Sequence, residues 1–460
     1  MATVTWIGNA AAVKQIDTIT VADVWTAADT VTLTVNGKDL VVTIGADTST
    51  TQVATAIRDA WNATSRLDSE GATDATSNFG GQECGEYAEA TASIDPDAPS
   101  VVRITANRAG IPFTLSVTEN TAGTGTAAEA TAQAATGPWY WDNGDNWDGG
   151  AAPSNDDIVI FRDSAVPTKY GLPNASKEVT LFVHQSFTGI IGLPEYNTEN
   201  PSKPYKEYRQ RYAKFDEAGS GSAVTHVFGI GEGNGSPMIN VWFATSTLTT
   251  SANVYGTGTP QPGMGPRALN ILIDNGAGGG GTLTVVRGSV YSGEQFGSKP
   301  SFATYNIGYT NAPASDVDLY IRNHNANVTL NQSGGTLLFV EDTTLGGSAS
   351  RTLNAYGGRS VWRDIQSSGN VTLVVYDSTV AWNANKTIFS VALGNKGVLD
   401  LEKDMRACTV TTCDLYAGAF LLDDFARGTY SAGIDLNHCG IDDVTVRLGN
   451  NRRLTPSTAA

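Results

Sequence analysis

Residues 378–401 read STVAWNANKTIFSVALGNKGVLDL, and two short apolar segments in it, STVAW and GVLDL, begin 19 residues apart. Three further segments continue the series: GTLLF (335–339), RSVWR (359–363) and GAFLL (418–422). A period near 20 residues, with one short strand and turn residues per unit, is typical of a β-solenoid, in which each coil buries its inward residues by stacking on the next. The earlier segments GSVYS (288–292) and DLYIR (318–322) fit more loosely. A large β-sandwich, with strands about every 8 to 12 residues, is the alternative.

Composition favours a mainly β chain and limits its partners. Charged residues make up 16% of the 460, and 50 are glycine, which favours strands joined by tight turns. The net charge of −17 argues against nucleic-acid binding, which needs clustered Lys and Arg. The start of the chain has no basic segment followed by an apolar one, and no run of about 20 apolar residues occurs anywhere. We therefore expect no signal peptide, no membrane partner and no nucleic-acid partner.

The first 119 residues predict a small α+β module. Val31–Val35 and Lys38–Ile44 flank Asn36-Gly37, which is the signature of a hairpin with a type I′ turn. A helix is expected next, with Ser49 and Gln52 as its capping box. Residues 120–137 are small, polar and free of aromatics, so they are interpreted as a linker. The solenoid is then expected over residues 138–460.

The stretch WYWDNGDNWDGGAAPSNDDIVIF (139–161) is expected to begin the solenoid. An EF-hand loop centred on Gly149 would lack oxygen ligands at its first and twelfth positions, so no metal is expected there. The open end of a stacked core instead needs rings to cover its apolar cross-section and polar side chains to bind turn amides. We therefore predict a cap built from Trp139, Trp141, Asn146, Trp147, Pro153 and Asp157.

Two resemblances follow from these segments. The stretch from Trp141 to Phe161 resembles the entry segment of bacterial surface β-solenoid proteins, including autotransporter passengers. Across most of the chain, TVTWIGNAAAVKQIDTITV, VHQSFTGIIGLPEYN, LNQSGGTLLF and DVTVRLG resemble uncharacterised virion-associated proteins of tailed bacteriophages. The second resemblance implies a structural head-decoration or fibre-type protein that is assembled in the host cytoplasm and carried on the virion. It also implies association with itself, as a homotrimer, and with the major capsid protein or other virion proteins.

An insertion between residues 196 and 217 combines basic and aromatic residues in an otherwise acidic chain. Tyr and Arg are favoured anchors of protein interfaces, so we predict a partner-docking surface, with a solvated loop as the alternative. The predicted residues are Lys203, Tyr205, Lys206, Tyr208, Arg209, Arg211 and Tyr212.

No catalytic residue, metal ligand or cofactor is predicted, and the chain is not expected to be an enzyme. The neighbouring acidic pairs Glu341-Asp342 and Asp423-Asp424 would point to opposite faces of a strand. Trp242, Trp362 and Trp382 lie in apolar segments, which favours core stacking over a sugar-binding platform. The four cysteines fit neither a disulfide framework nor a zinc site, so buried thiols are expected. The alternative function is a tail-associated adsorption protein, or tailspike, that binds or depolymerises a host surface glycan.

Overall fold

The structure is a computed structural model that describes most of the chain. The described residues are 2–64, 75–77, 85–174, 178–197, 205–216, 224–245, 250–275, 280–294, 299–310, 313, 316–342, 349–365, 369–384, 386–401 and 407–449.

Two long parallel sheets form the larger part of the molecule, and we call them the first and the second sheet. The first sheet contains, among the described residues, β1 (Thr3–Thr5), β10 (Asp157–Phe161), β11 (Val179–His184), β15 (Val224–Ile230), β17 (Thr250–Val254), β19 (Thr282–Val285), β21 (Thr304–Ile307), β23 (Val328–Gln332), β25 (Arg351–Ala355), β27 (Val371–Tyr376), β29 (Ile388–Gly394), β31 (Cys408–Leu415), β33 (Gly428–Tyr430) and β34 (Asp435–Leu436). The second contains β14 (Ala213–Asp216), β16 (Ile239–Thr245), β18 (Leu269–Asn275), β20 (Gly288–Gly293), β22 (Val317–Arg322), β24 (Thr336–Val340), β26 (Arg359–Arg363), β28 (Thr379–Asn383), β30 (Val398–Leu401), β32 (Phe420–Asp423) and β35 (Thr445–Leu448).

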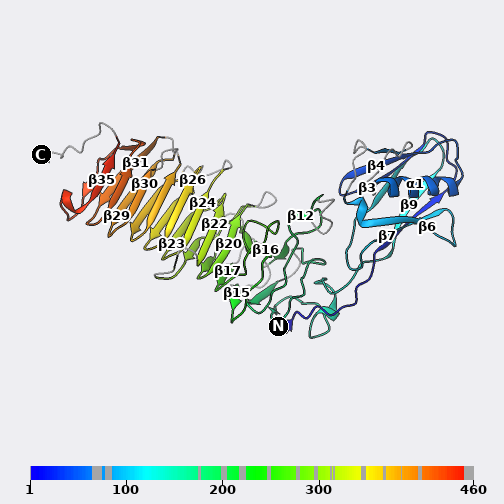
Figure 1. The fold of residues 1–460 in the computed structure, drawn as a ribbon, viewed down its shortest axis with the longest axis horizontal. Helices are drawn as coiled ribbons and strands as arrows, with labels where there is room; N and C mark the ends of the chain where they lie inside the picture. Colours follow the sequence, from blue (N-terminus) through cyan, green and yellow to red (C-terminus); the bar gives the residue numbers. More distant parts are fainter. Residues whose placement is uncertain are drawn as a thin grey trace.

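From β14 to β33, successive strands alternate between the two sheets, so each of these coils gives one strand to each sheet. In the last coil, β33 and β34 both pair with β31 of the first sheet before β35 joins the second. Figure 1 shows these coils stacked along the long axis of the molecule, from β15 to β35. The predicted β-solenoid is therefore confirmed. A sandwich is excluded because its sheets are antiparallel, whereas these strands pair in parallel.

The core of the solenoid lies between the two sheets. Along each strand the inward side chains alternate with outward ones, as in β24, where Leu337 and Phe339 are fully buried. Aromatic rings continue from coil to coil: the Phe339 and Trp362 centroids lie 4.6 Å apart, and those of Trp362 and Trp382 lie 5.7 Å apart. Trp362 and Trp382 are thus core residues, as predicted. The prediction was wrong for Trp242, which is half-buried on the outer face, with the Lys214 Nζ 4.2 Å from its ring centroid. Trp242 points outward because it alternates with the inward Val241 and Phe243 of the same strand.

The repeated segments of the sequence are consecutive strands of the second sheet, but their predicted alignment is shifted in places. Alignment by first residues would set Leu337 beside Val361, whereas the structure pairs Leu337 with Ser360 and Leu338 with Val361. Ser360 is fully buried and Val361 is half-buried. The alignment failed there because the inward position of β26 is occupied by a small polar residue and the apolar valine points outward.

The described residues of the α+β module form two four-stranded antiparallel sheets and one helix. One sheet has the order β6 (Ala90–Ile94), β7 (Val101–Ala106), β2 (Ile16–Ala22) and β9 (Thr126–Gln133), and the other has the order β5 (Ala75–Ser77), β4 (Lys38–Thr43), β3 (Thr30–Val35) and β8 (Ser116–Asn120). The helix is α1 (Thr50–Thr64). Short 3-10 turns in the described part of the chain are η1 (Tyr87–Glu89), η2 (Gly144–Asn146) and η3 (Ile441–Asp443). The predicted hairpin is confirmed, since Asn36 and Gly37 both have positive φ between β3 and β4. The capping box is present too, because the Ser49 Oγ accepts from the Gln52 amide at 3.3 Å and the Gln52 Oε1 accepts from the Ser49 amide at 3.4 Å.

The predicted linker is structured. Residues 120–137 contain β9, which pairs with β2 along its whole length at the edge of the module. Most side chains of β9 are exposed, so the strand has no alternation of apolar and polar residues. Its small polar residues therefore have the composition of a linker, which is why the sequence did not indicate a strand. The module therefore extends to Gln133.

The chain enters the solenoid before it forms the module. β1 pairs in parallel with β10, with Thr3 beside Ile158, and is thus a strand of the first sheet. The predicted start of the module at residue 1 is therefore wrong, because β1 belongs to the solenoid and the module begins with β2. The segment from β2 to β9 is inserted between β1 and β10, the first two strands of the stack. Figure 1 shows the N-terminus beside the first coils and two chain segments passing between them and the module.

Candidate functional site

The N-terminal end of the solenoid is filled by a cluster of tryptophan rings. The Trp147 ring packs edge-on against Trp6 at 5.1 Å and against Trp141 at 4.9 Å, and each of the three lies 5.9 Å from Phe161. All three tryptophans are at most 2% exposed. Trp6 was not predicted for this cluster, because its segment is separated from the Trp-rich stretch by the whole module.

Polar side chains fix the entering chain to the Trp-rich stretch. Asn146 is fully buried: its Nδ2 donates to the Gly137 and Tyr140 carbonyl oxygens at 2.8 Å, and its Oδ1 accepts from the Ala10 amide at 2.8 Å. The Asp157 carboxylate accepts from the Ala2 amide at 2.6 Å and the Ser154 amide at 2.9 Å. Of the remaining two predicted cap residues, Pro153 is buried. Trp139 is half-buried and packs against a separate cluster that includes Tyr140 and Tyr170.

Gly8 allows the two segments to approach closely. Its φ is +65°, and a Cβ there would lie 2.4 Å from the Val166 Cγ1. A larger residue would therefore strain the backbone and collide with the first coil.

The residues predicted for docking lie where the insertion meets the module. The insertion forms a two-stranded hairpin of β12 (Tyr196–Asn197) and β13 (Tyr205–Lys206). Lys203 lies outside the described residues. The Arg209 Nη2 lies 3.2 Å from the Glu89 Oε1 on the module, and its Nη1 donates to the Pro112 carbonyl oxygen at 2.8 Å. Tyr205 also donates to the Glu89 carboxylate. These anchors therefore bind within the chain.

The charged side chains at this joint between insertion and module are almost fully buried. The Arg209 and Glu207 side chains are 7% and 0% exposed, and the Arg209 Nε donates to the Glu207 Oε1 at 2.8 Å. Burial raises the pKa of Glu89, although the Arg209 charge opposes the shift. Burial lowers the pKa of Arg209, but its hydrogen bond to Glu207 and the Glu89 charge outweigh that effect and raise it overall. The guanidinium therefore stays charged between two carboxylates.

The other residues predicted for docking differ in exposure. Tyr208 is half-buried, and the Arg209 guanidinium lies 5.0 Å from its ring centroid. Arg211 and Tyr212 are buried, and burial raises the pKa of the Tyr212 phenol. Lys206 is exposed. The structure thus brings Tyr205, Tyr208 and Arg209 together at Glu89.

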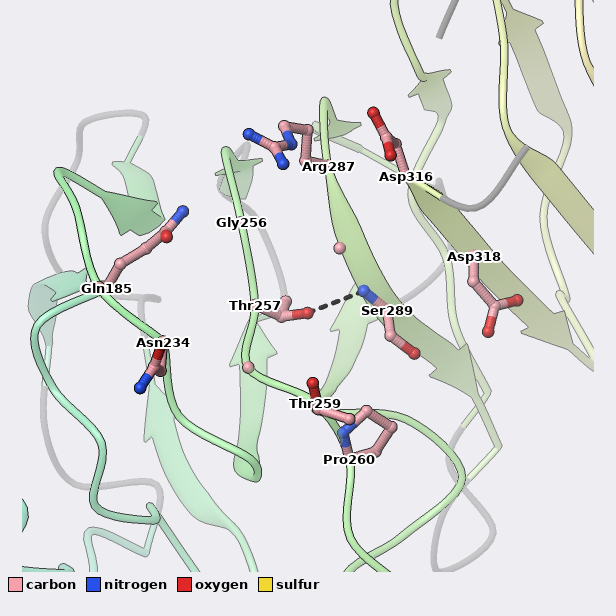
Figure 2. Close-up of a pocket in the computed structure, with 13 residues that line it drawn as sticks. Gln185, Asn234, Gly256, Thr257, Thr259, Pro260, Arg287, Ser289, Asp316 and Asp318 are labelled. Atoms are coloured by element: carbon pink, nitrogen blue, oxygen red, sulfur yellow. Dashed lines mark hydrogen bonds between the residues drawn. The ribbon is translucent and has the colours of Figure 1, made fainter. Parts of the chain in front are cut away.

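A polar groove crosses the corners where the chain passes from the first sheet to the second. Its volume is about 440 Å³. Figure 2 shows Gln185 and Asn234 on one side and Asp316 and Asp318 on the other. Between them, the Thr257 Oγ1 accepts a hydrogen bond from the Ser289 amide at 2.8 Å. The remaining lining residues are Gly233, Gly256, Gly258, Thr259, Pro260, Arg287 and Gly288.

The groove offers hydroxyl, amide, carboxylate and guanidinium groups. The Asp316 carboxylate accepts from the Tyr309 hydroxyl at 3.2 Å, and the Asp318 Oδ2 lies 2.6 Å from the Arg267 Nε. Groups of these kinds bind the hydroxyls of a sugar through hydrogen bonds. Sequence reasoning considered only adjacent acidic pairs and missed this one; the signal was the spacing of two between Asp316 and Asp318, which favours one face at the start of a strand.

In each of these two adjacent acidic pairs, one side chain points into the core and the other points outward, as predicted. Glu341 is fully buried with its Oε1 2.7 Å from the Arg351 Nε, whereas the Asp342 carboxylate lies outside, 2.9 Å from the Arg322 Nη2. Asp423 is buried and Asp424 is exposed. Neither pair presents two convergent carboxylates.

The cysteines of the last coils are thiols. Cys408 and Cys413 are buried and free, and burial raises the pKa of each to about 12. Cys439 is a half-buried free thiol, and Cys84 lies outside the described residues. Thiols with a raised pKa are weak nucleophiles at neutral pH.

The described part of the chain has neither a metal-binding cluster nor a helix suited to span a membrane. No group of three or more His, Cys, Asp or Glu side chains there is arranged to hold a metal ion. Among the described helices, none combines the length and hydropathy that a membrane span requires.

No protein-family model matches the chain, and a comparison with curated proteins gives no significant match.

Proposed function

We propose that the chain is a structural protein of a tailed-phage virion, a β-helical decoration or fibre protein that projects from the particle. The observation that supports this most is the joint between module and solenoid. Two chain segments cross it, and Arg209 closes it between Glu89 and Glu207. Such a joint would hold the stack of coils in a fixed orientation relative to the module, which a projecting fibre needs.

The module is the part proposed to attach, through the major capsid protein or another virion protein. Its own core is separate from that of the solenoid and includes Val53, Ile57 and Trp61 of α1. A separate core lets the module present a stable surface while the solenoid extends away from it.

Quantitative mass spectrometry of gradient-purified particles tests this proposal. Peptides of this chain should stay with the particles through a high-salt wash, at a fixed ratio to the major capsid protein, while an abundant host cytosolic protein is depleted. Hundreds of copies per particle would indicate head decoration, and a handful would indicate a tail position. Loss of the chain along with the host protein would contradict the proposal.

The groove supports a second candidate function, a tail-associated adsorption protein that binds or cleaves host polysaccharide. Purified protein should then bind the polysaccharide, and the double variant Asp316→Asn/Asp318→Asn should bind it at least tenfold more weakly. Asp47→Asn, at an exposed position in the module, is the control and should bind normally. Shortened polysaccharide chains would overturn a purely structural function, and absence of binding would remove this candidate.

A further inference from the structure

Over β21 to β26, the outer faces of the two sheets differ in chemistry. Further along, the first sheet exposes Phe389 in β29. On the first sheet, Thr304, Thr329 and Thr352 lie in register on neighbouring strands. Beside them, the Asn331 Nδ2 donates to the Asn306 Oδ1 and the Asn354 Nδ2 donates to the Asn331 Oδ1, both at 3.0 Å. The asparagine side chains thus bond to one another along their row, which continues through Val374 and Ala392.

The second sheet carries a mainly apolar row on its outer face. Each member pairs with the next along the stack, and the row runs Tyr291, Tyr320, Leu338, Val361, Ala381, Asp400, Leu422 and Arg447. Arg447 is exposed, Tyr291 and Ala381 are buried, and the other members are half-buried. Leu338 lies between the inward side chains of Leu337 and Phe339 and is half-buried. An apolar row of this kind, repeated at the strand spacing of about 4.8 Å, matches another surface with the same spacing.

Charged residues accompany this row. Arg359 and Arg363 are exposed on either side of Val361. Asp400 occupies the row two strands further along, and Arg447 ends it. An apolar centre bordered by arginines is the usual anatomy of a protein interface.

The order of residues selects one direction of pairing. Two parallel copies would set Asp400 opposite Asp400 and the arginines beside Val361 opposite one another. Reversing one copy about Ala381 sets Leu338 opposite Leu422, and Val361 with its arginines opposite Asp400.

We propose that the outer face of the second sheet binds a second copy of this chain, antiparallel and centred on Ala381. The pair uses β22 to β35, away from the module, so both modules stay accessible. The trimer expected from the sequence resemblance would instead need parallel copies. The surface is present whether or not the chain is carried on a virion, so its test is separate from the particle experiment.

Light scattering of the full-length protein after size exclusion tests the stoichiometry. The expected mass is that of two 48.2 kDa chains. Leu338→Asp should shift the mass to one chain, whereas Thr352→Asp, its match on the first sheet, should leave two. A wild-type mass of one or three chains would overturn the proposal.

Disulfide trapping tests the direction without relying on a disrupted surface. The single variants Leu338→Cys and Leu422→Cys are mixed, oxidised and digested, and cross-linked peptides are identified by mass spectrometry. A cross-link between position 338 of one chain and position 422 of the other is expected. A cross-link joining position 338 to itself would overturn the antiparallel arrangement, and no cross-link at either position would overturn the surface.

Discussion

The first coil and the middle coils of the solenoid differ in how far apart their paired strands lie in the sequence. In the middle coils, each strand pairs with its equivalent one coil away, as Trp362 does with Trp382. In the first coil, Thr3 pairs with Ile158 across the whole inserted module. The middle coils thus need only local repeats, whereas the first coil depends on contacts between remote segments. That difference decides which residues support the joint and which support the stack.

The largest effect is expected in the first coil, from Trp147→Ala. Removing this ring leaves a cavity between Trp6 and Trp141 and should lower the free energy of unfolding by about 3–5 kcal/mol. Denaturant unfolding measures the loss, and limited proteolysis should show new cleavage near residues 7–14. Trp382→Ala is the matched middle-coil variant: it should lower the free energy of unfolding by a similar amount without the new cleavage near residues 7–14. Equal cleavage in both variants would mean that the first coil does not depend on contacts between remote segments.

A second prediction concerns the buried ion pair of the middle coils. Arg351 is fully buried: its Nη2 donates to the His324 carbonyl oxygen at 2.7 Å and its Nη1 to the Ala326 carbonyl oxygen at 2.6 Å. Arg351→Met leaves Glu341 buried without its cation and should destabilise the protein by about 3 kcal/mol. The double variant Arg351→Met/Glu341→Leu should recover much of that loss in denaturant unfolding. No recovery would show that the arginine acts through its backbone contacts instead.

The pH dependence of stability should contain a contribution from the same coils. Burial, together with the nearby Arg351 charge, lowers the pKa of His324 to about 3, from about 6.5 in the unfolded chain. The unfolded state therefore binds more protons between these values, so this contribution is complete above pH 6.5 and is lost as the pH falls toward 3. By pH 5 the loss should be about 2 kcal/mol. His324→Gln should flatten the profile of unfolding free energy between pH 6.5 and 5, and an unchanged slope would contradict this account.

The smallest effect is expected at the joint, from Arg209→Lys. One ammonium group cannot replace the several directed contacts of the guanidinium, so about 1–2 kcal/mol should be lost locally. Hydrogen exchange should become faster around Glu89 and Pro112 but not in the coils after β22. Lys206→Ala, an exposed position nearby, is the control and should leave exchange unchanged.

The same comparison explains what could be predicted from the sequence. The second-sheet strands of the middle coils were found because their repeats are local. The prediction of one strand per unit was wrong, because each middle coil also gives a strand to the first sheet. The register at Ser360 and Val361 was missed because burial there does not follow polarity. β1 was missed because three residues without a repeat carry no sign of a partner beyond the module. The meeting of Arg209 with Glu89 was also missed, because no sequence pattern relates an arginine of the insertion to a glutamate of the module.

The central claim is that the N-terminal strand is the first rung of the stack and that the module is an insertion behind it. The Trp6 amide donates to the Ile160 carbonyl oxygen at 2.9 Å, and the Ile158 amide donates to the Ala2 carbonyl oxygen at 2.8 Å. Hydrogen–deuterium exchange of the full-length protein tests this most directly. The account predicts that the Trp6 amide exchanges as slowly as the amides of β10, and that Trp147→Ala accelerates both. Immediate exchange at Trp6, as in a frayed chain end, would contradict it.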